Sequence, residues 1–245
     1  MAKKLSLCRI TKIFNKGNFN EVCALKNIIL EFCPGENVLI RGHNGSGKST
    51  LVNLIDGRIE ATSGSIYIDS EQIDHLPTFK RARNVYRLFQ ESIHGVIPLG
   101  TIRENMAIAR GRHGRRTWWK SLIKSNEKGM FEKVMFEFRP ELSDKLDKKV
   151  FFLSPGERQA LVLALLKLQT DSNPQILLAD EPTASLDPEL AKRCITLIGE
   201  YASRGWLCLS VTHDINFIQN HQGRIIELRN GEVIFDNRSG GNNVI

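Results

Sequence analysis

A glycine-rich loop between an apolar run and a helical pattern constrains this chain more than any other segment. Residues 38–40, Val-Leu-Ile, suit a buried parallel strand, and a pattern typical of a helix begins near Lys48. Between them, GHNGSGKS matches the spacing GxxxxGK[ST]. Glycines let backbone N–H groups wrap a polyphosphate, and a helix N-terminus adds a favourable dipole. The sequence therefore predicts a strand, a phosphate-binding loop and a helix that together bind a nucleoside triphosphate.

Two side chains of this loop have defined chemical roles. We expect the Lys48 ammonium to reach the β and γ phosphates, and the Ser49 hydroxyl to coordinate Mg²⁺. Thr50 adds a further hydroxyl. The candidate ligand-binding residues are Gly42, His43, Asn44, Gly45, Ser46, Gly47, Lys48, Ser49 and Thr50.

A second apolar run ends in two carboxylates. Residues 176–179 read as a buried strand, and Asp180 and Glu181 follow directly. Ligands of open α/β sheets lie at the carboxyl ends of the strands, so these acids should face the phosphates. We expect Asp180 to hold Mg²⁺ and Glu181 to act as general base on the attacking water. An Asp-Glu pair taken alone is as often a solvated turn, but here it follows a phosphate-binding loop.

A third strand and a glutamine complete the set of candidates. Residues 207–211 are followed by Thr212, His213 and Asp214, and a histidine at such a strand end can hydrogen-bond the γ-phosphate and orient the water. Gln90, which closes VYRLFQ, carries an amide that could reach Mg²⁺ or the water.

Composition limits the class of protein. The 245 residues, with 41% hydrophobic and 25% charged, fit one core with or without an inserted lobe. The longest apolar run, residues 160–166, is far short of the ~20 residues that span a bilayer, so we expect a soluble or peripheral protein. Five scattered cysteines without a CxxC pair and no visible export signal favour a reducing cytosol. A net charge of +7 favours a polyanionic partner.

Five motifs occur in a fixed order: GHNGSGKST, LFQ, LSPGERQ, ILLADEPTASLD and SVTHD. In this order they resemble the ATP-binding cassette ATPases, the nucleotide-binding subunits of membrane transporters, over essentially the whole chain. The resemblance implies an α/β P-loop NTPase with a RecA-like core, an antiparallel β region and an inserted α-helical lobe at about residues 91–168 of a single domain, 1–245. It also implies head-to-tail closure of two copies, each ATP lying between one P-loop and the partner's signature.

The resemblance assigns further roles by motif. Phe14 takes the adenine-stacking position, usually a tyrosine, and residues 184–187 form the D-loop. It implies ATP contacts from Phe14, Ser154, Gly156, Glu157 and Asp187 in addition to the loop residues, Mg²⁺ contacts from Ser49, Gln90 and Asp180, and catalytic roles for Lys48, Gln90, Glu181 and His213.

The signature departs from the family pattern LSGGQ. Pro155 replaces the first glycine, and Glu157 replaces the glutamine. Read physically, S-P-G-E is a capping box with proline at the first helical position, where the missing N–H has no intrahelical partner. We therefore expect the departure to be tolerated, with Gly156 and the Ser154 hydroxyl left for a γ-phosphate. Fewer donors could weaken ATP-driven closure.

Closer similarity, in GRHGRRTWW and GERQALVLALLKL among other segments, is to the standalone ATPase of a bacterial importer group. That group pairs with a permease and a lipoprotein binding protein, and some members are linked to aromatic amino acids. The implied location is the cytoplasmic face of the inner membrane. The alternatives are the ATPases of lipoprotein-releasing or macrolide export systems and, with less support, a nucleic-acid-linked or ribosomal cassette. The features of that last class, coiled coils, zinc sites or two cassettes in one chain, are missing here.

The segment at residues 110–124 is rich in arginine and contains Trp118 and Trp119. It could be a solvated basic helix, a membrane-interface contact or a grip on single-stranded RNA. Since the helical lobe faces the permease in the resembling family, the membrane side is favoured over RNA.

Overall fold

The computed structural model describes residues 4–111, 127–169, 176–184 and 186–239. The described residues group into two compact units, the first within Met1–Arg87, Pro174–Pro182 and Ile198–Ile245, the second within Leu88–Asn173 and Thr183–Leu197. Trp118, Trp119 and most of the basic segment lie outside the described residues. Across the described ranges, no helix combines the length and apolar character needed to cross a membrane.

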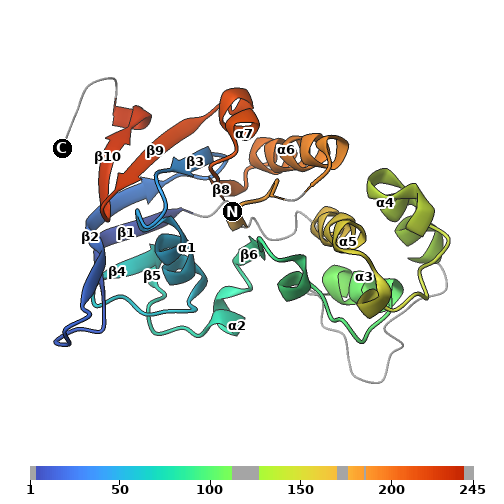
Figure 1. Cartoon of the computed structure of the whole chain (residues 1–245), viewed down its shortest axis with the longest axis horizontal. Helices are drawn as coiled ribbons and strands as arrows, with labels where there is room; N and C mark the ends of the chain where they lie inside the picture. Colours follow the sequence, from blue (N-terminus) through green and yellow to red (C-terminus); the bar gives the residue numbers. More distant parts are fainter. Residues whose placement is uncertain (1–3, 112–126, 170–175, 185, 240–245) are drawn as a thin grey trace. The chain divides into compact units, whose positions relative to one another are not determined.

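Two sheets build the first unit (Figure 1). One is antiparallel with the order β2-β1-β4-β5, and the other has six strands in the order β10-β9-β3-β8-β7-β6. In the second sheet β9, β3, β8 and β7 run parallel, and β10 pairs antiparallel with β9. The strands are β1 (Leu5–Phe14), β2 (Val22–Phe32), β3 (Asn37–Arg41), β4 (Ser63–Ile68), β5 (Glu71–Gln72), β6 (Val85–Leu88), β7 (Ile176–Asp180), β8 (Leu207–Val211), β9 (Arg224–Arg229) and β10 (Glu232–Asp236).

The three strands predicted at residues 38–40, 176–179 and 207–211 are confirmed as β3, β7 and β8. Residues 176–180 and 207–211 are buried throughout, as expected for strands covered on both faces. Strand β8 lies between β3 and β7 and runs parallel to both. The carboxyl ends of all three strands therefore meet at one edge, where Gly42, Glu181 and Thr212 follow them.

One apolar core joins both sheets to helix α1 (Lys48–Asp56). Leu51, Val52, Leu54 and Ile55 of this helix belong to the same buried cluster as residues of β1, β2, β4, β3, β7, β8 and β9. Burying one Leu or Ile side chain contributes roughly 1.5–3 kcal/mol, so this packing fixes α1 firmly. Because α1 begins with Lys48, the core also fixes the end of the glycine-rich loop.

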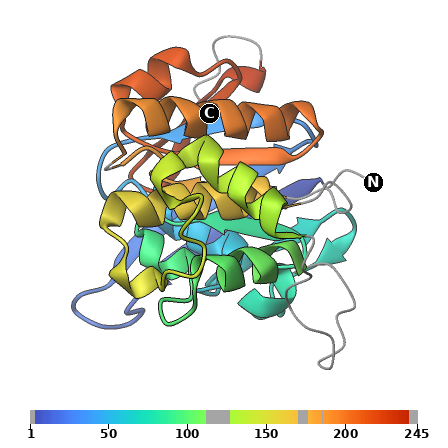
Figure 2. The same ribbon diagram turned by 90° about the vertical axis from the view of Figure 1, so that its right-hand side faces the viewer.

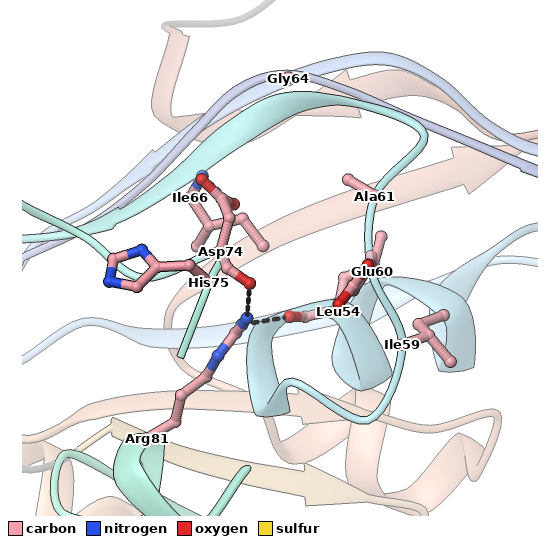
Figure 3. A pocket seen from close by; sticks show the side chains of 9 residues that line it. All are labelled: Leu54, Ile59, Glu60, Ala61, Gly64, Ile66, Asp74, His75 and Arg81. Atoms are coloured by element: carbon pink, nitrogen blue, oxygen red, sulfur yellow. Dashed lines mark hydrogen bonds between the residues drawn. The ribbon is translucent and has the colours of Figure 1, made fainter. Parts of the chain in front are cut away.

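Arg81 closes the other end of α1. Its buried guanidinium donates to the Leu54 and Ile55 carbonyls, which lie in the last turn of the helix, and to the Asp74 carbonyl. Figure 3 shows Arg81 reaching between Leu54 and Asp74 at the wall of a pocket of about 350 Å³. The pocket also contacts the side chains of Ile59, Glu60, Ala61, Ile66 and His75. It lies at the end of α1 opposite the glycine-rich loop.

The second unit is built around three helices that pack against one another, α3 (Ile102–Gly111), α4 (Lys128–Phe138) and α5 (Pro155–Lys167) (Figure 2). Residues 160–166, the longest apolar run of the sequence, are all buried within α5. Phe131 and Met135 of α4 are fully buried as well. The short 3-10 helices of this unit are Ser92–Gly95, Pro140–Leu142 and Val150–Phe152.

The remaining helices are short except for α6 (Pro188–Ser203). It begins at Pro188, and proline is favoured in the first turn of a helix. Its first residues group with the second unit and its last with the first unit. The others are α2 (Thr78–Arg81), α7 (Ile215–Asn220) and the 3-10 helix Asn237–Ser239.

Two glycines give a test of the backbone constraints. Gly64 in β4 has φ +91°, and a Cβ there would lie 2.4 Å from the Arg9 carbonyl oxygen. Gly199 lies within α6, and a Cβ there would meet nothing within 4 Å. We expect Gly64→Ala to lower the free energy of unfolding by about 1–3 kcal/mol. Gly199→Ala should raise it by about 0.4–1 kcal/mol.

Urea denaturation of both variants against the wild type measures these changes. A Gly64→Ala protein that unfolds at the wild-type midpoint would show that β1 and β4 approach each other less closely than described.

Candidate nucleotide-binding and catalytic site

The glycine-rich loop between β3 and α1 has a backbone that only glycine fits at two positions. Gly42 has φ +152° and Gly47 has φ +104°. A Cβ on Gly42 would lie 2.2 Å from the Leu228 carbonyl oxygen, and one on Gly47 would lie 2.6 Å from the Ala24 carbonyl oxygen. The loop is therefore held against neighbouring strands on its inner side. By contrast, a Cβ on Gly45 would meet nothing within 4 Å, so the loop is open there.

The loop offers hydrogen-bond donors that suit an anion. Gly47 is the N-cap of α1 and has no side chain, so it supplies no acceptor to the first-turn amides of the helix. The buried Ser46 hydroxyl has no hydrogen-bond partner within the described part of the chain. Amides at a helix N-terminus together with a hydroxyl form a cradle that fits a phosphate group.

Lys48 is folded back over the loop. Its ammonium donates to the carbonyl oxygens of Gly42 at 2.7 Å and His43 at 2.9 Å. Burial lowers the pKa of Lys48, while the nearby Glu181 and Asp180 carboxylates act in the opposite direction and raise it. The Lys48 ammonium therefore interacts electrostatically with both predicted acids.

Glu181 is fixed by three residues at the end of the third predicted strand, β8. Its N–H donates to the Val211 carbonyl, and its carboxylate accepts from the Thr212 hydroxyl at 2.9 Å. The other carboxylate oxygen lies 2.7 Å from Nδ1 of His213. Glu181 has φ +48°, an uncommon conformation for a side chain of this kind and one that costs of order 1–3 kcal/mol. Such strain at a strand end is typical of functional sites.

Asp180, the last residue of β7, contacts a cation that the motifs do not predict. Its Oδ2 accepts from Nη2 of Arg87 at 2.7 Å. Thr212, which bonds the Glu181 carboxylate, is a second contact that the motifs do not predict. Both lie beside motif residues in the chain, Arg87 three before Gln90 and Thr212 one before His213, and that adjacency is the signal that could have found them.

Phe14, the predicted adenine-stacking residue, ends β1 and is partly exposed. The Lys12 ammonium lies 5.0 Å from its ring centroid, within the range of a cation–π contact. The ring thus keeps an accessible aromatic surface in the first unit.

The signature residues lie in the second unit and form the predicted capping box. The Glu157 N–H donates to the Ser154 hydroxyl oxygen at 3.2 Å, and the Ser154 N–H donates to Oε2 of Glu157 at 2.7 Å. Pro155 occupies the first helical position, as expected. Burial acts to raise the pKa of Glu157, but the Ser154 amide and the Lys148 ammonium outweigh it and lower the pKa overall.

Arg139 borders the signature and was not indicated by any motif. A Cβ on Gly156 would lie 3.3 Å from Nη2 of Arg139, and Nη1 of Arg139 lies 3.7 Å from Oδ2 of Asp187. Asp187 in turn accepts from the Leu190 N–H at the start of α6. An arginine therefore lies between the signature turn and the predicted D-loop.

The predicted residues thus divide between the units. The first unit brings together the loop, Lys48, Asp180, Glu181 and His213, and it also carries Phe14. The second holds Gln90, which is exposed just after β6, and the residues Ser154, Gly156, Glu157 and Asp187.

A phosphate-cradling loop after one parallel strand, with paired acids after a neighbouring strand, defines a P-loop nucleoside triphosphatase. Comparison with known proteins gives the family. The family model described as ABC transporter matches residues 25–184. The chain therefore belongs to the ATP-binding cassette family and is an ATPase of the ABC transporter type.

Relatives and solved structures agree with this family. The chain is 36% identical to the tyrosine transport ATP-binding protein of Clostridioides difficile (strain R20291), over 86% of this chain and 82% of that protein. It is 36% identical to the phosphonates import ATP-binding protein PhnC 2 of Synechococcus sp. (strain JA-2-3B'a(2-13)), over 87% of this chain and 78% of that protein. Its fold matches an ATP-binding cassette solved as a dimer in a post-hydrolysis state bound to ADP and Pi. The match has a TM-score of 0.76 and 29% sequence identity, and it covers 95% of this chain and 97% of that chain.

Replacing Lys48 tests the phosphate cradle. We expect Lys48→Ala to weaken ATP binding about 10- to 100-fold, because a charge-assisted hydrogen bond to phosphate contributes about 1.5–3 kcal/mol. Titration with a fluorescent ATP analogue measures the affinity, and circular dichroism checks the fold. Lys133→Ala, which removes an exposed lysine of α4, is the matched control and should bind as the wild type does. Equal affinity of both variants would contradict the assignment.

Proposed function

We propose that this chain is the ATP-hydrolysing subunit of an importer, and that two copies close head to tail on two ATP molecules to drive a separate permease. The observation that carries the chemistry is the Glu181 carboxylate, held by Thr212 and His213 close to the Lys48 ammonium. The dimeric form of the similar cassette with bound ADP and Pi supports the assembly.

In this proposal the loop amides, the Ser46 hydroxyl and Lys48 bind the phosphates, and Phe14 stacks on the adenine. Ser49, Asp180 and Gln90 hold Mg²⁺, which supplies charge neutralisation on the phosphates when it is bound. The support is the chemistry of the donor set, because hydroxyl, carboxylate and amide oxygens are the ligands that Mg²⁺ prefers.

Glu181 acts as general base. It takes a proton from the water that attacks the γ-phosphorus, the bond to the leaving ADP oxygen breaks, and ADP and phosphate form. His213 and Thr212 keep the carboxylate in one orientation, which lowers the cost of positioning it for each turnover. Release of products then reopens the pair, and Gln90 transmits the motion to the permease.

The signature of one copy contacts the ATP of the other. Ser154, Gly156 and Glu157 supply this contact, with Asp187 on the adjoining D-loop. Pro155 removes one backbone donor, but it does so where a helix leaves its first amides unpaired. The nearby Arg139 guanidinium adds positive charge at this turn, which supports tolerance of the departure.

Import is favoured over export because the similar relatives are named for tyrosine transport and phosphonates import. We propose a small organic solute as cargo, with an aromatic amino acid as the first class to test. The partners are then an integral-membrane permease and an extracytoplasmic binding protein. The chain lies on the cytoplasmic face of the cell membrane.

Glu181→Gln tests the catalytic assignment. We expect ATP hydrolysis to slow by roughly 10²- to 10⁴-fold, because loss of a general base has this effect, while ATP still binds. A phosphate-release assay gives the rate. Glu189→Gln is the matched control, since Glu189 is an exposed residue of α6 paired with Arg193, and it should keep the wild-type rate. A Glu181→Gln protein as fast as the control would refute the assignment.

The importer assignment is tested by affinity purification of tagged Glu181→Gln protein with ATP in mild detergent. Recovery of a polytopic membrane protein together with a binding lipoprotein supports import. Recovery of RNA or ribosomal proteins without a membrane protein would overturn the transport role.

A further inference from the structure

An ion pair beside the proposed metal site is the starting point. Arg87 lies in β6, the strand next to β7, and its guanidinium is almost fully buried, with 7% of the side chain exposed. Nη2 donates to Oδ2 of Asp180 at 2.7 Å, and the aspartate side chain is 13% exposed. A charge-assisted hydrogen bond of this length between buried groups fixes both side chains.

The arginine is held from a second direction by helix α1. Nη1 of Arg87 donates to Oδ1 of Asn53 at 2.6 Å and lies 3.3 Å from Oδ2 of Asp56. Both partners belong to the helix that begins at Lys48, and that helix is packed into the core. The position of the guanidinium is therefore set independently of Asp180.

This arrangement limits what Asp180 can do. The planar guanidinium holds one carboxylate oxygen, Oδ2, in a fixed direction, which leaves the other, Oδ1, for a metal ion. A side chain fixed in this way loses little rotamer freedom when it coordinates a metal. It also presents one oxygen rather than two, which suits the octahedral geometry that Mg²⁺ requires.

We propose that Arg87 is a positioning residue for Mg²⁺ binding: tied to α1 through Asn53 and Asp56, it aligns the Asp180 carboxylate with the metal of the nucleotide complex. The inference rests on the proposed role of Asp180 as a metal ligand. It links the two parts of the site through one side chain, since α1 carries Lys48 and β7 carries Asp180 and is followed by Glu181.

Arg87 has two opposing effects on Mg²⁺ binding, so the direction in which Mg²⁺ affinity changes when Arg87 is replaced shows which effect is larger. The positive charge of Arg87 near Asp180 reduces the attraction of the carboxylate for a cation, whereas orientation of the ligand strengthens binding. Groups that hydrogen-bond metal ligands typically change metal affinity or activity about 10- to 100-fold when they are replaced. In the proposal the orientation of Asp180 is the larger effect, so removal of Arg87 weakens the binding of Mg²⁺ in the nucleotide complex.

The experiment measures binding of an ATP analogue with an N-methylanthraniloyl group, in the Glu181→Gln protein, with EDTA and across a Mg²⁺ titration. For Arg87→Met we expect affinity in EDTA within about 2-fold of the parent, and a half-maximal Mg²⁺ concentration raised roughly 10-fold. Arg87→Lys keeps the charge but not the planar fork, so we expect a smaller increase. It also serves as the test if Arg87→Met fails to fold.

Arg58→Met is the matched control. Arg58 bonds Asp56 at 3.0 Å from the outer side, so its loss disturbs the same carboxylate but leaves the Arg87–Asp180 contact in place. Its Mg²⁺ dependence should equal that of the parent.

Unchanged Mg²⁺ dependence in Arg87→Met or, if that variant fails to fold, in Arg87→Lys would overturn the positioning role. Tighter Mg²⁺ binding would overturn it in favour of competition between Arg87 and the metal. If the parent and Asp180→Asn respond to Mg²⁺ alike, the metal role of Asp180 itself fails, which is a separate result.

Discussion

Parallel hydrogen bonding of β3, β8 and β7 is the constraint on which the rest of this molecule depends. Because the three strands run in one direction, each delivers its next residues to the same edge of the sheet: Gly42 from β3, Glu181 from β7 and Thr212 from β8. A shift of β7 by one residue against β8 would turn the side chains of β7, including Ala179, to the opposite face and separate Glu181 from its partners. The burial of all five residues in each of β7 and β8 makes such a shift costly. The chemistry of the site thus follows from backbone pairing and core packing before any polar contact forms.

A balance of positive and negative charges is the second constraint on the residues at the carboxyl ends of these strands. Asp56 and Asp180 both contact Arg87, and Glu181 follows Asp180 in the chain. Carboxylates gathered in a poorly solvated place repel one another unless cations lie between them. Lys48 and Arg87 supply that separation from opposite elements, the loop and β6. Lys48 in addition satisfies two loop carbonyls, so the same ammonium shapes the phosphate cradle and offsets the acids. The site is therefore organised by its own charges, which favours a pre-formed arrangement over one that assembles around the nucleotide.

The amino-acid sequence predicts the parts of this structure that depend on local pattern. Residues 38–40 and 176–179 are continuously apolar and 207–211 are apolar except for Ser210, so all three are typical of buried strands. The capping box at Ser154 is predicted correctly because the S-x-x-E spacing itself brings the two hydrogen-bonding side chains to the helix start. Long-range side-chain contacts are different. Arg87 and Asp180 are 93 residues apart, and Thr212 and Glu181 are 31 apart. No local sequence pattern predicts that Arg87 of one strand will contact Asp180 at the end of another. The grouping of residues 183–197 with the second unit is equally a matter of tertiary contacts.

The capping box has a consequence for hydrogen-bond supply at the signature. The Ser154 hydroxyl uses a lone pair to accept from the Glu157 amide, and a hydroxyl that accepts in this way still holds its own proton. The Glu157 carboxylate, meanwhile, is turned back to the Ser154 amide and the Lys148 ammonium. The helix start thus occupies one lone pair of the Ser154 hydroxyl and pairs the Glu157 carboxylate locally, and it leaves the hydroxyl proton available to donate. Although Pro155 removes one donor of the family pattern, the turn therefore keeps the Ser154 hydroxyl proton for an incoming anion. The Glu157 carboxylate is held by the Ser154 amide and the Lys148 ammonium.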